Sequence, residues 1–491
     1  MSKRRLPFTI PSLRLVELRT GQVSRDLAQH LREAIAHGSL RPGERLPSTR
    51  ALATSLGVAR GTVVEVFAQL AAEGYLNSKV GAGTCVASTM SDRQFVLSPG
   101  AGVSLNDLEP RLPEAAARLT EVARNLVPQS PAPFAIAVPG AGIAPDNAWR
   151  RLGNRIRATP DGGPTGYGSS LGLNELRSAI AAYVRRARGV RCEMDNIIIT
   201  SGTQQGLYMA ARVLLSQGDA VWAENPAYPG LTAVLDDVGA LTHRLPIDEE
   251  GLQVEYGLTN WPNARAAFVT PSHQYPLGMP LSMARRQALV AWAEQANAWI
   301  VEDDYDSELR YAGHPFPAMQ GLSPTRVIYL GTFSKILFPS LRLGYLVAPT
   351  QLVEAFAGAR AMLDRHSPTA DQHVLAAYMQ EGLFEAHVRR IRNLYAERRA
   401  VLLTELSSIL PSEWKVQPCD QGMHIILWLP CGAEDVQFSE KVRRAGIVTR
   451  PVSPMYEPST ARSGLMLGFG GFTAKQLQDA VFQLGQIIRQ F

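Results

Sequence analysis

Residues 331–345 read GTFSKILFPSLRLGY and directly follow a short apolar run at 327–330. An apolar run of this length, ended by a glycine, predicts a buried strand of a sheet. Lys335 therefore lies just beyond the end of a strand, where its amine can condense with an aldehyde. Two hydroxyls and a guanidinium accompany it and suit a phosphate dianion. These three residues are Thr332, Ser334 and Arg342.

The chain on both sides of this motif alternates short apolar runs with helical patterns. Such alternation predicts an α/β fold with a largely parallel central sheet and helices on both faces. Ligands bind to sheets of this kind at the carboxyl ends of the strands. We expect strands at 196–200, 220–223, 266–269, 299–301 and 327–330.

Polar and aromatic residues follow several of these predicted strands. Asp303 comes just after the run at 299–301, where a carboxylate can pair with a protonated pyridine nitrogen. Tyr305, two residues on, emerges on the same face and can bond a ring hydroxyl, although the stretch can also be an ordinary acidic loop. A helix N-terminus after the strand at 196–200 offers a second phosphate contact. These further candidates, with an aromatic that can stack on a cofactor ring, are Gly202, Thr203, Gln204 and Tyr228.

The positive charge of the chain is concentrated at its N-terminal end. Residues 1–87 contain 12 Lys/Arg and 6 Asp/Glu, whereas the rest of the chain contains 37 and 38. A small basic region joined to a nearly neutral large one indicates nucleic acid as a partner of the first part. The alternative is a basic surface without a partner.

Helical periodicity in the same basic region predicts a helix-turn-helix followed by a wing. A first helix ends near residue 37, a second runs from Ser48 to Gly57, and a third spans about 62–73. Two short strands around a glycine-rich turn follow within 75–86. Four residues are candidates for contacts with the phosphates or bases of double-stranded DNA: Arg50, Arg60, Thr62 and Lys79.

The overall composition is that of a soluble globular protein with several domains. The chain has 491 residues, of which 46% are hydrophobic and 19% charged, and its formal net charge is +5. This excludes a disordered or fibrous chain. No apolar run is long enough to span a membrane, and no secretory leader is recognisable. The four cysteines form no CxxC pair, so we expect a reducing cytoplasm, no disulfide framework and no metal site.

Two parts of the chain resemble known families. The stretch LRPGERLPSTRALATSLGVARGTVVEVFAQLAAEGYL, with the wing VGAGTCV, resembles the GntR-type winged helix. From residue 135 onward the chain resembles the fold-type I pyridoxal phosphate (PLP) aminotransferases. The motifs that carry this likeness are TGYGSSLGLNELR, TSGTQQ, ENPAYPG, TPSHQYPLGMP, EDDYDSELRY and GTFSKILFPSLRLGY.

The second resemblance implies PLP as the cofactor and a role for each motif residue. Lys335 is implied as the aldimine lysine, Asp303 as the partner of the pyridine nitrogen and Tyr305 as the partner of the ring hydroxyl. Tyr228 is implied to stack on the ring. The residues implied near the phosphate are Gly202, Thr203, Gln204, Thr332, Ser334 and Arg342.

Two further residues come from the same resemblance. Tyr167 in this family often reaches the phosphate of the partner subunit, which implies a homodimer. His273 lies in the loop that normally carries an asparagine just before Pro276, where this chain has Tyr275. We include His273 among the candidate cofactor residues.

The combination of both parts resembles the MocR subfamily of bacterial transcription regulators. It implies a winged helix over 15–87, a linker over 88–134, and an aminotransferase-like domain over 135–491 that ends in a smaller α/β part. The implied function is a regulator that binds DNA and senses PLP, or an amine or amino-acid effector, through Lys335. The alternatives are an active aminotransferase with an accessory DNA-binding domain, and a scaffold that only dimerises.

The chain departs from the aminotransferase pattern at two positions. Met466 stands where many aminotransferases have the arginine that holds the substrate carboxylate, and Gly230 stands where GABA-responsive regulators have an arginine. A methionine cannot hold a carboxylate. The possible substitutes are Arg310, Arg450 and Arg462, among which the sequence does not choose.

Overall fold

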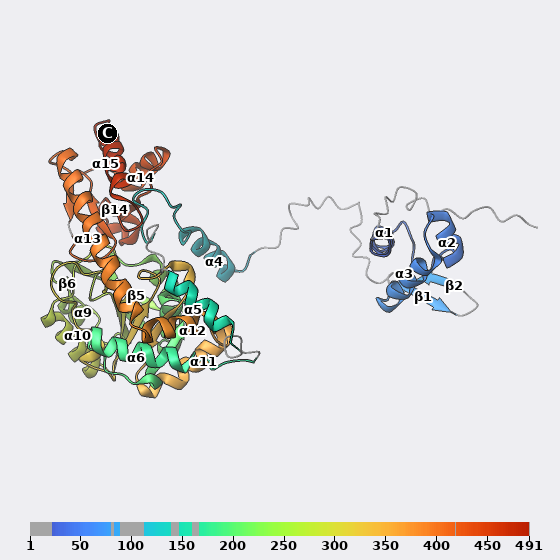
Figure 1. Ribbon diagram of the computed structural model, residues 1–491, viewed down its shortest axis with the longest axis horizontal. Helices are drawn as coiled ribbons and strands as arrows, with labels where there is room; N and C mark the ends of the chain where they lie inside the picture. The colour runs from blue at the N-terminus through green and yellow to red at the C-terminus, as the bar shows by residue number, and fades with distance from the viewer. Residues whose placement is uncertain are drawn as a thin grey trace, which may run out of the picture. The chain divides into compact units, whose positions relative to one another are not determined.

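The computed structural model describes residues 22–79, 83–88, 112–138, 147–159, 166–417 and 419–490. They divide into two compact units, the second beginning at Leu112 (Figure 1). Some predictions lie outside the described residues: the start of the winged helix at 15–21, its turn at 80–82 and the first half of the linker, 89–111. The side chain of Lys79 is also outside the description.

The first unit is a winged helix, as predicted. Ser48 caps the second helix, since its Oγ accepts a hydrogen bond from the Ala51 N–H at 3.2 Å, and Gly57 ends it with φ +67°. The third helix begins at Arg60, two residues earlier than expected. The elements are α1 (Val23–Ala36), α2 (Thr49–Leu56), α3 (Arg60–Ala72), β1 (Leu76–Lys79) and β2 (Gly83–Val86), with β1 and β2 antiparallel.

The second unit contains the predicted mostly parallel sheet, which has eight strands in the order β3-β10-β9-β8-β7-β4-β5-β6. The strands from β9 to β5 are parallel, and β10 runs antiparallel to both of its neighbours. The strands are β3 (Ile197–Thr200), β4 (Ala220–Asn225), β5 (Leu241–Asp248), β6 (Gly251–Leu252), β7 (Ala266–Val269), β8 (Trp299–Asp304), β9 (Val327–Thr332) and β10 (Gly344–Val347).

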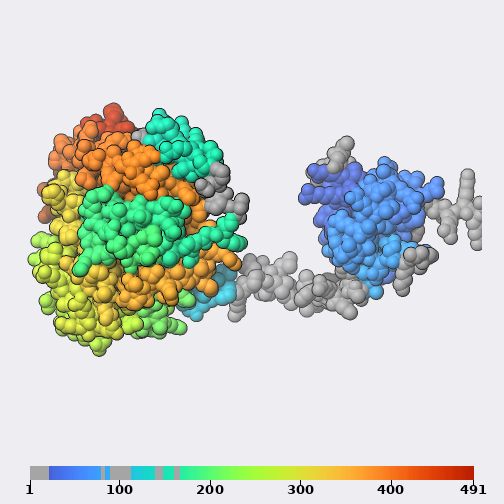
Figure 2. Space-filling view, turned by 60° about the horizontal axis from the view of Figure 1, so that its bottom comes forward, coloured from blue at the N-terminus to red at the C-terminus, as the bar shows by residue number. Residues whose placement is uncertain are grey.

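Helices cover both faces of this sheet. Alternate residues of each strand point to opposite faces, so each strand contributes side chains to two cores. Ile197 and Ile199 belong to the core under α5, α6, α12 and α13, whereas Ile198 belongs to the core under α7, α8 and α11. Figure 2 shows segments that are distant in sequence, green and orange, adjoining on one face. The helices are α5 (Asn147–Arg157), α6 (Asn174–Arg188), α7 (Thr203–Leu214), α8 (Pro229–Asp237), α9 (Val254–Asn260), α10 (Met283–Gln295), α11 (Val353–Asp364), α12 (Ala370–Gln380) and α13 (Leu383–Ile409).

The C-terminal part adds a smaller antiparallel sheet in the order β11-β12-β14-β13, packed with two more helices. Within it, Arg450 of β13 is the direct partner of Met466 of β14. No helix among the described residues is both long and apolar enough to cross a membrane. The elements are β11 (Lys415–Gln417), β12 (His424–Trp428), α14 (Asp435–Arg444), β13 (Arg450–Pro451), β14 (Gly464–Gly468) and α15 (Ala474–Ile488).

The later part of the expected linker is built into the large unit. Helix α4 (Glu114–Asn125) contacts α8, and the chain after it follows the C-terminal part. The Gln129 amide donates to the Thr449 carbonyl at 3.0 Å, and the Phe134 carbonyl accepts from the Gly468 N–H at 2.8 Å. Phe134 is fully buried. The hydrogen bonds and this buried ring explain why 112–134 packs as part of the large unit.

A candidate cofactor cavity and a DNA-binding surface

A cavity of about 520 Å³ opens at the carboxyl ends of β8 and β9. It brings together ten of the twelve cofactor residues expected from the sequence, which come from five separate segments of the chain. These ten are Gly202, Thr203, Gln204, Tyr228, Asp303, Tyr305, Thr332, Ser334, Lys335 and Arg342.

One end of the cavity is suited to a phosphate group. Helix α7 begins here at Thr203, and the amides of a helix N-terminus attract anions. The Thr332 and Ser334 hydroxyls lie 3.1 Å apart. Gly202 has φ +100°, and a Cβ at this position would lie 3.5 Å from the Arg342 guanidinium. The arginine therefore reaches the helix terminus, and together these groups can neutralise and hydrogen-bond a dianion.

Asp303 is the acidic residue of the Glu302–Asp304 triplet that faces the cavity. Its neighbours Glu302 and Asp304 point to the opposite face of the sheet, because side chains alternate along a strand. There the Arg188 guanidinium pairs with Asp304 at 2.8 Å, and two backbone N–H groups donate hydrogen bonds to Glu302. Burial, and then the nearby Asp304 charge, raises the pKa of Asp303 to about 8. Its Oδ1 is buried and has no hydrogen-bond partner among the described residues. An orphaned carboxylate oxygen fits the N–H of a protonated pyridine ring.

Lys335 and Tyr228 complete the cavity. Burial lowers the pKa of Lys335, partly opposed by the Asp306 and Asp303 charges, and this favours the neutral amine that attacks an aldehyde. Position 230, where GABA-responsive regulators have an arginine, is packed too closely for a residue larger than glycine. A Cβ there would lie 2.2 Å from the Gln204 Oε1 and 2.4 Å from the Tyr228 ring.

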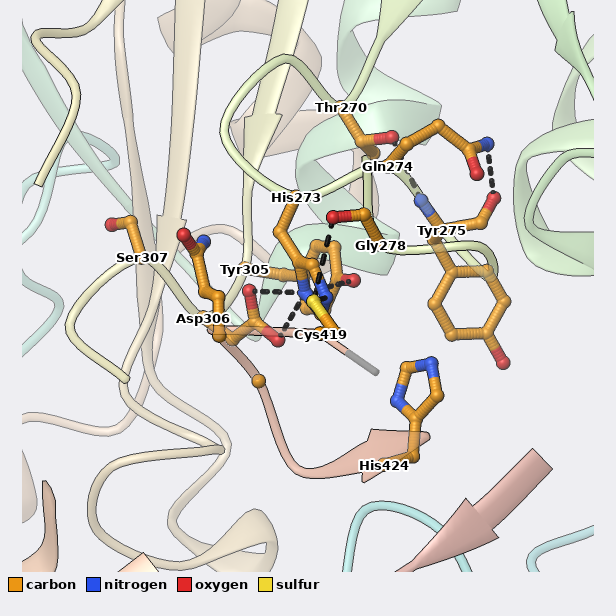
Figure 3. A network of polar contacts seen from close by, with 12 residues as sticks. Thr270, His273, Gln274, Tyr275, Gly278, Tyr305, Asp306, Ser307, Cys419 and His424 are labelled. Atoms are coloured by element: carbon orange, nitrogen blue, oxygen red, sulfur yellow. Dashed lines mark hydrogen bonds and ion pairs between the residues drawn. The ribbon is translucent and has the colours of Figure 1, made fainter. Parts of the chain in front are cut away.

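The two remaining candidates do not line the cavity. His273 lies behind Tyr305, whose hydroxyl is 2.9 Å from the His273 Nδ1 (Figure 3). It therefore contacts a cavity residue without facing the cavity. Tyr167 is 81% exposed, with the Arg365 guanidinium 4.8 Å from its ring.

The structure adds residues that the sequence analysis missed or left open. Arg450 lines the cavity beside Tyr275, whereas Arg310 and Arg462 line a different cavity. Arg450 of β13 lies directly opposite Met466 of β14. Its side chain therefore projects from the same side of the sheet as the carboxylate-binding arginine that many aminotransferases have at the position of Met466. No local motif reveals this, because the pairing joins residues of two strands. Further lining residues that the sequence did not assign to the site include Thr270, Tyr275, Asp306 and His424.

The DNA-binding candidates lie on the surface of the winged helix. Arg50 and Arg60 are exposed and Thr62 is partly exposed. Ala59, the N-cap residue of α3, makes no side-chain hydrogen bond to the amides of the first turn. Such amides can bind a DNA phosphate. Arg45, which was not predicted, lies against the wing, since a Cβ on Gly83 would be 2.9 Å from its guanidinium.

Comparisons with known proteins agree with both halves. Residues 23–86 match the family described as bacterial regulatory proteins, gntR family, and residues 140–480 match aminotransferase class I and II. The probable rhizopine catabolism regulatory protein MocR of Rhizobium meliloti is 36% identical over 465 residues, which cover 94% of this chain and 92% of that protein. The chain belongs to the MocR subfamily of GntR-type transcription regulators.

Two further comparisons extend this assignment. The MocR-type chain is 35% identical to the pyridoxine biosynthesis transcriptional regulator PdxR of Corynebacterium glutamicum, over 94% of this chain and 95% of that protein. The kynurenine aminotransferase structure from Pyrococcus horikoshii is similar with a TM-score of 0.69 and 27% identity, over 79% of this chain and 96% of that one. This MocR-type protein is therefore a transcription regulator with a DNA-binding GntR domain. Its fold-type I aminotransferase domain implies pyridoxal phosphate, as predicted.

A pH dependence follows from the environment of Asp303. Its folded-state pKa of about 8 lies above the ordinary value of 3.8, so the fold favours the protonated carboxyl. Ionising this carboxyl in the folded protein lowers the free energy of unfolding. The loss is absent at low pH and grows as the pH rises toward 8. We expect cofactor-free Asp303→Asn protein to be more stable than the parent at pH 8 by at least about 1 kcal/mol. The advantage should shrink as pH falls.

Thermal denaturation of both proteins between pH 5.5 and 8.5 measures this difference. Asp479→Asn, which changes an exposed carboxylate on α15, is the matched control and should show no such trend. A stability difference that is constant over the whole pH range would contradict the assigned environment of Asp303.

Proposed function

We propose that this regulator holds pyridoxal phosphate in the 520 Å³ cavity through Lys335, and that occupancy of the cavity changes its binding to DNA. One observation carries the proposal. Residues 126–129, which directly follow α4 on the chain leading from the DNA-binding unit, line the same cavity as Lys335. A ligand in the cavity therefore contacts the segment through which the two units are joined.

Each cavity residue has a defined task in this proposal. Pyridoxal phosphate supplies an aldehyde that exchanges between amines, on a ring that withdraws electrons when its nitrogen is protonated. Asp303 keeps the ring nitrogen protonated, Lys335 supplies the resident amine, and the Tyr305 hydroxyl bonds the ring oxygen. Tyr228 covers the ring. The phosphate is bound by the α7 terminus and by Thr203, Gln204, Thr332, Ser334 and Arg342.

The position of Arg450 supports an effector that is an amine and also carries an acid group. It is the arginine in the cavity that lies opposite Met466, so it can replace the missing carboxylate ligand. Its neighbour Thr449 accepts the hydrogen bond from the Gln129 amide, and Gln129 also accepts from the Ile136 N–H at 3.0 Å. An acid bound by Arg450 thus acts one residue away from the linker contact. Coupling to DNA binding requires that a ligand at Arg450 binds two states of this contact with different affinity.

Arg450→Met tests this anchor. We compare alanine with ethylamine, which lacks the carboxylate, by titrating each into the PLP-loaded protein and following the visible absorption. The parent should respond to alanine at concentrations at least about tenfold lower, as expected for a charge-assisted contact. In Arg450→Met this preference should disappear. Arg462→Met, which changes an arginine of the other cavity, should retain the preference. A preference unchanged in Arg450→Met would contradict the role of Arg450.

We further propose that the protein is a homodimer in the bacterial cytoplasm, where its DNA lies. Tyr167 supports the dimer because it is 81% exposed and does not reach the cavity of its own chain. Met362 and Leu363 at the end of α11 are also exposed, by 87% and 42%, and precede Arg365, which packs on Tyr167. An exposed apolar group of this kind is typical of a subunit contact.

The direct test of this function is the DNA affinity of the full chain with and without pyridoxal phosphate. An affinity that responds to the cofactor or to an amino acid supports the regulator. Turnover of amino acids without specific DNA binding would support the alternative, an active aminotransferase.

A further inference from the structure

Three side chains from distant parts of the chain form a cluster beside the cofactor cavity, which one of them, Asp306, also lines (Figure 3). The Cys419 Sγ lies 3.1 Å from the His273 Nε2, and the Asp306 Oδ2 lies 2.9 Å from the His273 Nδ1. His273 comes from the loop after β7, Asp306 follows β8, and Cys419 precedes β12. This order of thiol, imidazole and carboxylate is the arrangement that activates a nucleophile.

Two glycines make room for the cluster. Gly278 has φ +88°, and a Cβ there would lie 2.8 Å from the Cys419 Sγ and 3.1 Å from the His273 Nε2. Gly422 has φ +84°, and its Cβ would lie 2.2 Å from the His273 Cε1 and 2.9 Å from the Asp306 Oδ2. Any larger residue at either position would displace the imidazole. The close approach of thiol, imidazole and carboxylate thus depends on the backbone as well as on the three side chains.

Burial and charge favour a protonated His273. His273 is 2% exposed, and burial alone lowers its pKa. The Asp306 carboxylate and the Cys419 sulfur outweigh burial, so the pKa of His273 lies well above its usual value. The other groups facing it are the Tyr305 hydroxyl and His424, whose pKa burial lowers to about 4, which leaves that ring neutral.

The thiol has access to solvent on the side away from the cofactor. Cys419 is partly exposed and lines a second cavity of about 1020 Å³ together with Gly278, Arg310 and Gln421. Small molecules can therefore reach the sulfur without passing through the cofactor cavity. The chain also contains internal references: Cys431 is exposed, and Cys192 is buried, which raises its pKa to about 11.

We propose that Cys419 is an activated nucleophilic thiol, and hence an oxidisable modification site, with His273 as its base and Asp306 as the residue that holds His273. The co-reactant is a hydroperoxide. The Cys419 thiolate attacks one peroxide oxygen, so that an S–O bond forms and the O–O bond breaks. The sulfur is oxidised by two electrons to a sulfenic acid. The leaving hydroxide, or alkoxide, takes the proton from the His273 imidazolium and departs as water or an alcohol.

This site is connected to the cofactor cavity through two neighbours of His273, Asp306 and Tyr305, which both line that cavity. The His273 Nδ1 contacts both Asp306 and the Tyr305 hydroxyl. Because oxidation of Cys419 removes a proton from the His273 imidazolium, it changes the hydrogen bond between His273 and Tyr305. This link to the cofactor rests on the proposed function, because it assumes that Tyr305 bonds the cofactor ring. The reactivity of the thiol does not.

The test measures the reaction of each cysteine with hydrogen peroxide and with iodoacetamide, by mass spectrometry, in the full chain without added cofactor. At pH 6 we expect Cys419 to react at least about tenfold faster than Cys431, because the His273 imidazole lies 3.1 Å from the Cys419 sulfur and can take its proton. His273→Gln should bring the Cys419 rate down to that of Cys431. A Cys419 rate no higher than that of Cys431 in the parent, or one unaffected by His273→Gln, would overturn the proposal.

The pH profile of the parent protein keeps the test independent of how well the variant folds. The ratio of the Cys419 rate to the Cys431 rate should be larger at pH 6 than at pH 8; a ratio that does not change with pH would overturn the proposal. In PLP-loaded protein, peroxide should shift the visible absorption of the parent but not of Cys419→Ser. If the chain binds no cofactor, the proposed function fails while the thiol measurements still decide this inference.

Discussion

Replacing Lys335 by alanine is expected to abolish covalent attachment of pyridoxal phosphate and, with it, the visible absorption band. The variant cavity would retain the other proposed contacts with the cofactor, including Asp303 and the hydroxyls of Thr332 and Ser334, so weak non-covalent binding should remain. Reduction with borohydride fixes the attached cofactor on its lysine. The labelled peptide should change from the one containing Lys335 in the parent to none in the variant.

The labelled lysine is easy to identify because the chain has six lysines. Lys415 in β11 is exposed and serves as the matched control; Lys415→Ala should label as fully as the parent. Survival of the band in Lys335→Ala, or labelling of another lysine in the parent, would show that the wrong amine has been assigned.

The second large effect is expected on DNA binding. Arg50→Ala combined with Arg60→Ala removes two exposed cations of the winged helix, on α2 and at the first residue of α3. Each phosphate contact contributes about 0.9 to the slope of log affinity against log salt concentration. We expect the slope to fall by about 2 for each winged helix bound and the affinity to fall by one to two orders of magnitude at low salt.

Arg32→Ala is the control within the same unit. Its guanidinium is bound to both oxygens of Glu73, at 2.7 and 2.8 Å, so its charge is already paired. We expect the salt slope of this control to stay at the parent value. An unchanged affinity and slope in the double variant would refute the assignment of these arginines to the DNA surface. Circular dichroism establishes that both variants are folded.

Local patterns in the sequence predicted most of the fold and of the cavity. The strands came from apolar runs, and the residues that follow them converge because parallel strands present their carboxyl ends on one edge. Lys335, Asp303 and Tyr305 fall within this convergence, and the winged helix followed from helical periodicity and from the stop at Gly57.

What the sequence could not predict depends on contacts between distant segments. Arg450 enters the cavity because β13 pairs with β14, and the Cys419–His273 contact joins residues 146 positions apart. The linker was predicted to extend to residue 134, but Gln129 and Phe134 are held by partners in the C-terminal part. His273 was proposed as a cofactor residue, whereas the structure places it behind Tyr305. Its partner Asp306 carries no local signal beyond an acidic stretch.

The most direct measurement is fluorescence anisotropy of the full chain on DNA from upstream of its own gene, at fixed salt, without PLP, with PLP, and with PLP plus alanine. The account predicts specific binding by a dimer, with an affinity that changes at least about fivefold between these states. An affinity that is the same in all three states would contradict the coupling between cavity and DNA. Absence of specific binding, with the cofactor attached to Lys335, would contradict the regulator itself and favour the enzyme.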